Sequence, residues 1–151
     1  MLEHSMKLET VMPLFKEHLA AGQTVTFSPR GVSMRPMLYQ GRDTVELSPL
    51  PEGRLNKHDL PLYQRDDGQY VLHRIIKVGE HYTCVGDNQF TLEYPVRHDQ
   101  LIAVVTAFTR NGKYIKVTSP WYRLYYHFWY VSRPVRHVCR WLKGRLKRLF
   151  T

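Results

Sequence analysis

A chain of 151 residues, 43% of them apolar, is long enough to bury one hydrophobic core and shows neither low complexity nor an internal repeat. Its two cysteines, Cys84 and Cys139, match no metal-ligand spacing and no disulfide scaffold, so we expect no metal, no cofactor and a reducing compartment. The charge of +9 is concentrated at one end, because residues 101–151 carry 11 Lys and Arg and no acid. A near-neutral body with a basic end indicates a polyanionic partner.

The beginning of the chain is predicted to be helical. Apolar residues recur at helical spacing from Leu8 to Leu19, which favours one amphipathic helix within residues 1–22. Pro13 is compatible with this helix if Thr10 is the N-cap and Pro13 lies in the first turn; otherwise it kinks the helix.

The first six residues lack the apolar core of a signal peptide, so we expect nothing here to export the protein. One interpretation has residues 1–5 added ahead of a native Met6.

Residues 23–118 are expected to form a compact, mainly β domain, because short β-branched or aromatic runs alternate there with turn formers. The predicted strands are Thr24–Phe27, Thr44–Leu47, Leu60–Gln64, Tyr70–Val78, His81–Val85, Leu101–Phe108 and Tyr114–Val117. The last two strands are predicted to form a hairpin that turns at Asn111-Gly112.

Residues 119–151 are predicted to form a helical appendage in two segments. Trp121–Val131 is mostly aromatic, and Pro134–Phe150 places apolar residues on one face and Lys and Arg on the other. The second segment has the features of a helix that lies on a membrane surface. For the first segment, packing on the β domain is an equal alternative.

Two residues in the β region suggest acyl-transfer chemistry. Ser33 follows a predicted strand in a turn that Gly31 loosens and Pro36 limits, and such a turn can direct backbone N–H groups toward an oxyanion. His73 lies inside a predicted apolar strand, where an imidazole needs a polar partner. Each residue has a plain alternative: serines near Gly and Pro usually make turns, and a half-buried histidine is usually only a satisfied one.

The ordered motifs resemble a known family. Ser33-Met34-Arg35-Pro36, then His73-Arg74 in a strand, then Gly86-Asp87-Asn88 resemble the S26 signal peptidases of the endoplasmic-reticulum and archaeal type, relatives of the LexA-like peptidases. Asp43 and Asp59 match the acidic strand starts of that family. The resemblance implies the signal peptidase/LexA-like β fold and a serine endopeptidase activity on extended leader or signal-like peptides.

The resemblance also implies roles for single residues. Ser33 is the nucleophile, His73 the general base, and Asp87 the acid that orients or charge-stabilises the imidazole, unless Asp87 only caps a β-turn. Lys77, four residues after His73 and on the same predicted strand face, is the alternative base. The second acid of the family is matched only by Glu93, so a role for Glu93 is in doubt.

The chain departs from the family in two ways. Gly31 stands where many signal peptidases have a hydroxyl residue, so the oxyanion donors would be backbone N–H groups, chiefly that of Ser33. A membrane anchor is also missing, because residues 1–22 are charged and too short to span a bilayer. We therefore expect a cytoplasmic protein held on the inner face of the membrane, with an anionic lipid surface as partner of the C-terminal helix and nucleic acid as the alternative partner.

Two other classes of function stay open. One is a non-catalytic module that binds a peptide or tethers a partner at the membrane. The other is a self-cleaving regulator, although no Ala-Gly or Cys-Gly site precedes Ser33. A hydrogen bond between Ser33 Oγ and the His73 ring would favour the enzyme.

Overall fold

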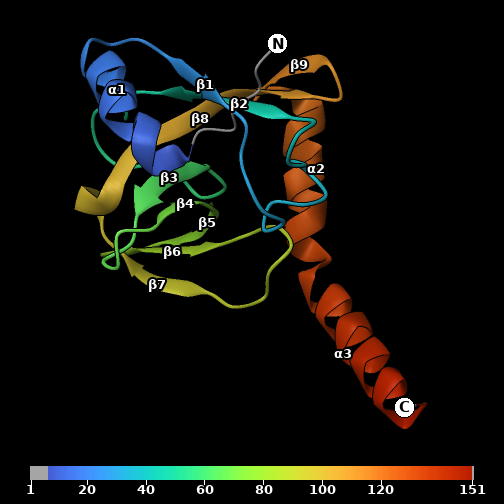
Figure 1. The fold of residues 1–151 in the computed structure, drawn as a ribbon. Helices are drawn as coiled ribbons and strands as arrows, with labels where there is room; N and C mark the ends of the chain where they lie inside the picture. Colours follow the sequence, from blue (N-terminus) through green and yellow to red (C-terminus); the bar gives the residue numbers. More distant parts are fainter. Residues whose placement is uncertain (1–6, 151) are drawn as a thin grey trace. The chain divides into compact units, whose positions relative to one another are not determined.

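A computed structural model of the chain describes residues 7–150 (Figure 1). About 31% of these residues lie in helices and 29% in strands, arranged as two antiparallel sheets and three α-helices. The expectation of a mainly β protein is therefore correct only in part, because the fold is mixed. The helical share is as large as the strand share because two helices follow the last strand. The expectation for residues 1–5 lies outside the described residues.

The larger sheet has strand order β1-β2-β8-β3-β4, and β9 pairs with β8 off this path. Its strands are β1 Val25–Phe27, β2 Thr44–Ser48, β3 Pro61–Gln64, β4 Tyr70–Leu72, β8 Leu101–Arg110 and β9 Lys113–Lys116. Alternate residues of β2 are buried, as its β-branched and apolar pattern predicts. The predicted hairpin at Asn111-Gly112 is confirmed, because both residues have the positive φ that a tight two-residue turn needs.

The smaller sheet has strand order β5-β6-β7, with β5 Arg74–Val78, β6 Tyr82–Val85 and β7 Glu93–Val96. The prediction of one strand over Tyr70–Val78 is wrong, because the chain leaves the larger sheet after Leu72 and enters the smaller sheet at Arg74. His73 is the single residue between the two strands. No Gly or Pro separates the two strands and both contribute to the same core, so the sequence pattern shows no change of sheet.

Strand β7 was not expected from the sequence, because Pro95 lies inside it. Proline cannot donate a hydrogen bond to a neighbouring strand, and it usually argues against a strand. β7 is an edge strand of its sheet, paired only with β6, and this is the position where a proline is tolerated. Glu93 is the first residue of β7, so its position beside β6 was not predicted either.

Helix α1 spans Leu8–Ala20 and buries Met12 and Leu19. Thr10 is not the N-cap, the condition under which Pro13 would lie in the first turn, because the N-cap is Lys7, three residues earlier and without a side-chain cap. Pro13 therefore lies inside the helix beyond its first turn. α1 packs beside β1, where the Phe15 and Phe27 rings lie 6.1 Å apart.

The chain divides into two units, Met1–Val117 and Thr118–Thr151. The second unit holds α2 Pro120–Val131 and α3 Arg133–Leu149, separated by Ser132. Proline at the start of each helix fits, because the first helical N–H groups have no partner within the helix. Within residues 7–150, no helix is both long enough and apolar enough to cross a membrane.

Candidate active site

Ser33 and His73 line the same cleft of the first unit. This cleft has a volume of about 1380 Å³, and residues from α1, β1, the 28–44 connection, β3, β4 and Gln89 form its walls. Apolar side chains line this cleft as well, among them Met34, Leu38, Leu62, Val71 and Leu72. Ser33 and His73 are 40 positions apart in the sequence, and both line this one cleft.

The segment after β6 holds the Ser33 turn in place. The Asn88 N–H donates to the Ser33 carbonyl at 2.8 Å, and the Asn88 side-chain amide donates to the Val32 carbonyl at 3.1 Å. At Gly86, an added Cβ would lie 2.7 Å from the Ser33 carbonyl oxygen and 3.1 Å from Ser33 Cβ. Only glycine permits so close an approach of the two backbones. The Gly86-Asp87-Asn88 motif therefore braces the serine turn through its first and third residues.

The turn leaves the backbone N–H of Ser33 available to a bound atom. Gly31 has a φ of +84°, which favours glycine, and its N–H donates to the Gln40 side chain at 2.9 Å. Within residues 7–150, the N–H of Ser33 donates to no other group. This N–H can therefore donate to an atom bound in the cleft.

His73 is 3% exposed and lies between a tyrosine and a carboxylate. Its Nδ1 is 3.2 Å from Glu93 Oε1 and 3.4 Å from the Tyr63 hydroxyl, and that hydroxyl donates to Glu93 Oε2 at 2.8 Å. A carboxylate beside Nδ1 favours the tautomer that carries its proton there. The other ring nitrogen, Nε2, is then a free acceptor, which is the form a general base needs.

The surroundings of His73 keep its imidazole neutral. Burial lowers the pKa of His73 below its ordinary value, the Glu93 carboxylate opposes this effect, and the Arg65 guanidinium adds to it. Arg65 forms an ion pair with Glu93, and Arg65 also lines the cleft. Hydrogen bonds from Arg65 and Tyr63 outweigh the burial of Glu93, so the pKa of Glu93 is lowered and its carboxylate stays charged.

The structure pairs Asp87 with Arg74, in contrast to the expectation that Asp87 orients the imidazole. Arg74 Nε and Nη2 each donate to an Asp87 oxygen at 2.8 Å, and both side chains are buried. Asp87 still raises the pKa of His73 by its charge. The carboxylate beside His73 Nδ1 is that of Glu93, the residue whose role the sequence left in doubt.

Lys77, the alternative base, does not line the cleft and is exposed. Two features keep Lys77 from lying on the same strand face as His73. The chain changes sheets at His73, and a bulge between Ile75 and Lys77 shifts the pairing of β5 with β6.

The direct contact that would favour the enzyme is not formed. Within residues 7–150, no hydrogen bond joins Ser33 Oγ to the His73 ring. Catalytic hydrogen bonds are often long before substrate binds and shorten in the complex.

The two acids that match the strand starts of the family serve the backbone. Asp43 is fully buried and accepts hydrogen bonds from the N–H groups of Tyr39 at 2.8 Å and Asn111 at 3.0 Å, together with an ion pair from Arg42. Asp59 accepts from the Asn56 N–H at 2.8 Å. Each acid fixes a loop, and neither is placed for proton transfer with His73.

Burial raises the pKa of the Cys84 thiol to about 12, so this side chain stays protonated and is a poor nucleophile. Among residues 7–150, no cluster of His, Cys, Asp and Glu could hold a metal ion.

Sequence reasoning missed Tyr63, Arg65 and Asn88 as site residues. Tyr63 and Arg65 lie at the end of β3 and follow no motif, and only the pairing of β3 with β4 brings them beside His73.

Comparison with family models, with curated proteins and with solved structures finds no match to this chain.

Proposed function

We propose that this protein is a serine endopeptidase of the signal peptidase/LexA-like type, with Ser33 as nucleophile and His73 as general base. The observation that carries the proposal is the shared cleft, into which Ser33 and a neutral His73 with a carboxylate on Nδ1 both face. The ordered motifs add to it, because contacts link them: Gly86 and Asn88 brace the serine turn, and Asp87 pairs with Arg74, the residue after His73. Glu93 takes the place of Asp87 as the acid of the Ser-His-acid triad.

The residues divide the chemistry as follows. His73 Nε2 accepts the proton of Ser33 Oγ as the oxygen attacks the scissile carbonyl, and Glu93 stabilises the imidazolium that forms. The Ser33 N–H donates to the oxyanion. Proton transfer from His73 to the leaving amine breaks the C–N bond and leaves an ester on Ser33. A water molecule, deprotonated by His73, then hydrolyses this ester and restores the serine.

The cleft suits an extended peptide. β1 and β4 each pair with a single neighbour in the larger sheet, and residues of both strands line the cleft. An end strand has free backbone N–H and C=O groups on one side, to which a peptide can add as a further strand. Apolar side chains in the lining of the cleft favour a peptide with apolar residues. Leader or signal-like segments of small proteins meet both requirements.

The test is hydrolysis of a mixture of unstructured synthetic peptides, followed by mass spectrometry in isotopically labelled water. We expect cleavage inside the peptides, with one labelled oxygen in each new carboxyl end. The same preparation of the Ser33→Ala protein is the control for a contaminating peptidase. Equal cleavage by that protein, or no cleavage of any peptide, would contradict the proposal.

The rate of cleavage, measured as kcat/KM against pH, is expected to rise with a midpoint below about 6.5, the ordinary pKa of histidine. Burial lowers the pKa of His73, so the neutral base is present from a lower pH than for an exposed histidine. Glu93→Gln should move the midpoint lower still, because the carboxylate that raises this pKa is removed and the Arg65 charge is left.

Lys77→Met is the control for this pH profile and should leave the midpoint unchanged, since Lys77 lies outside the cleft. A midpoint well above that of histidine, lost in the Lys77→Met protein, would assign the base to Lys77.

A non-catalytic peptide-binding module is the second candidate function. It is favoured by one observation, the missing hydrogen bond between Ser33 Oγ and the His73 ring among the described residues. Such a module would use the same cleft and the same free strand ends. Peptide binding without hydrolysis, equal in the wild-type and Ser33→Ala proteins, would select it.

A further inference from the structure

The second unit carries an exposed apolar stripe that runs through both of its helices. Its members follow one another at intervals of three or four residues: Trp121, Leu124, Phe128, Val131, Val135, Val138, Leu142, Leu146 and Leu149. At about 100° per residue, they fall within an arc of about 100° of a continuous helix. The Ser132 junction has a φ of −75° and a ψ of −5°, close to helical, so it does not end the pattern.

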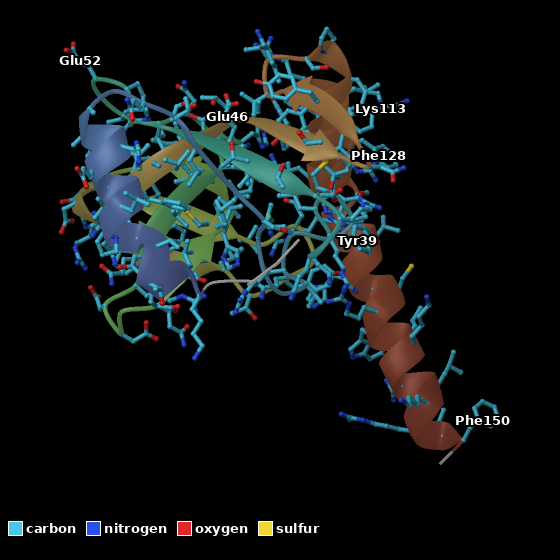
Figure 2. All side chains as sticks on the ribbon, turned by 45° about the horizontal axis from the view of Figure 1, so that its top comes forward. Tyr39, Glu46, Glu52, Lys113, Phe128 and Phe150 are labelled. Atoms are coloured by element: carbon cyan, nitrogen blue, oxygen red, sulfur yellow. The ribbon has the colours of Figure 1, made fainter. Side chains whose placement is uncertain are left out.

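This stripe is open to solvent along its whole length. Its least exposed member is Leu142, at 46%, and its most exposed member is Leu149, at 75%. Figure 2 shows side chains projecting along α3, with Phe150 at its end and Phe128 on α2. Soluble proteins rarely leave an apolar surface of this extent uncovered.

The face opposite the stripe is basic. Residues 118–151 contain eight Lys and Arg and no acid: Arg123, Arg133, Arg136, Arg140, Lys143, Arg145, Lys147 and Arg148. Of these, all except Arg145 project about a quarter turn or more away from the centre of the stripe. The Arg136 guanidinium lies over the Trp129 ring, 3.7 Å from its centroid, so an aromatic residue borders the basic face.

We propose that the helices α2 and α3 lie on the surface of an anionic lipid bilayer. A bilayer interface is the partner that satisfies both faces, since acyl chains cover the apolar stripe while lipid phosphates meet the basic side chains. A second copy of this chain would cover the stripe but would bring two basic helices together with no acid to pair them. A nucleic acid would meet the basic face but would leave the stripe exposed.

The two faces make separate contributions that can be measured apart. Burial of the stripe drives binding to any bilayer, whereas each Lys or Arg near an anionic surface strengthens binding by roughly fivefold at low salt. The electrostatic part weakens as salt screens the charges, and the apolar part does not.

The test is co-sedimentation of the full chain with vesicles of phosphatidylcholine, with and without phosphatidylserine, at low and high salt. Three variants are compared with the wild type. The stripe variant carries Val138→Gln, Leu142→Gln and Leu146→Gln, and the basic-face variant carries Arg140→Gln, Lys143→Gln and Lys147→Gln. The matched control carries Lys16→Gln, Lys77→Gln and Lys113→Gln, which removes the same charge from the first unit.

We expect the wild type to bind vesicles with phosphatidylserine, and binding to weaken with salt. The stripe and basic-face variants should each lose at least about tenfold in affinity for these vesicles, and the control less than about twofold. Circular dichroism of each variant shows whether the helical content is kept, as glutamine is a good helix former.

Three outcomes would overturn the proposal. One is unchanged binding of the stripe and basic-face variants. The second is tight binding of duplex DNA or RNA without any binding to vesicles. The third is a dimer in analytical ultracentrifugation that the stripe variant abolishes, again without binding to vesicles. None of these depends on peptide hydrolysis, so the peptidase proposal stands or falls separately.

Discussion

Replacing Ser33 with Ala or His73 with Gln is expected to lower kcat/KM for peptide hydrolysis by at least about 10³-fold. Alanine lacks the attacking oxygen, and glutamine has no nitrogen that can accept its proton. The Ser33 turn should survive the first change, because Gly86 and Asn88 hold it through its backbone. Glutamine keeps a polar group beside Glu93, which an alanine at this buried position would not.

Because the two residues act as one unit, the double variant should be about as slow as either single variant. Ser28→Ala and His81→Gln are the matched controls. Ser28 lines the same cleft but uses its hydroxyl to bind the Asp43 carbonyl at 2.9 Å, and His81 lies outside the cleft. Both controls should keep activity close to wild type. Losses that multiply in the double variant would mean that Ser33 and His73 do not cooperate.

Asp87→Asn is expected to destabilise the first unit by roughly 3–5 kcal/mol, because breaking a buried ion pair leaves an uncompensated charge. Arg74 and Asp87 are only 3% and 5% exposed, and two hydrogen bonds of 2.8 Å join them. Asparagine supplies one acceptor oxygen and no charge. The free energy of unfolding is measured by urea denaturation of the wild-type and variant proteins, followed by circular dichroism.

The control is Asp66→Asn, whose partner Arg97 is exposed, so only a small change in stability is expected. The double variant Arg74→Met, Asp87→Leu should recover much of the loss, since an apolar pair leaves no buried charge. Full stability of the Asp87→Asn protein together with lost hydrolysis would contradict this structural role. That result would return Asp87 to the catalytic role first expected for it.

Much of the local structure can be predicted from the sequence. Helical spacing predicts α1, α2 and α3 to within a few residues, and Asn111-Gly112 predicts its hairpin, because both signals depend on neighbours along the chain. Gly31 before Ser33 likewise predicts a turn, and the structure gives Gly31 a positive φ there. The amphipathic pattern of residues 121–149 needs no tertiary contact to be recognised, since its two faces are set by periodicity alone.

The partners of His73 could not be predicted in this way. The ring lies where the chain passes from one sheet to the other, and its neighbours Tyr63 and Glu93 belong to different sheets. Pro95 argues against a strand at β7, so no sequence pattern places Glu93 opposite Cys84 and beside the imidazole.

The partners of Asp87 and Lys77 could not be predicted from the sequence either, because strand pairing sets them. A motif names residue types but not the group that each one meets, and Asp87 meets Arg74 because β5 and β6 are paired. Lys77 kept its spacing from His73 in the sequence, but the change of sheet and the bulge turned it away from the cleft. Spacing along the chain predicts which face a residue occupies only while the strand stays regular, and at this site the tertiary structure interrupts it.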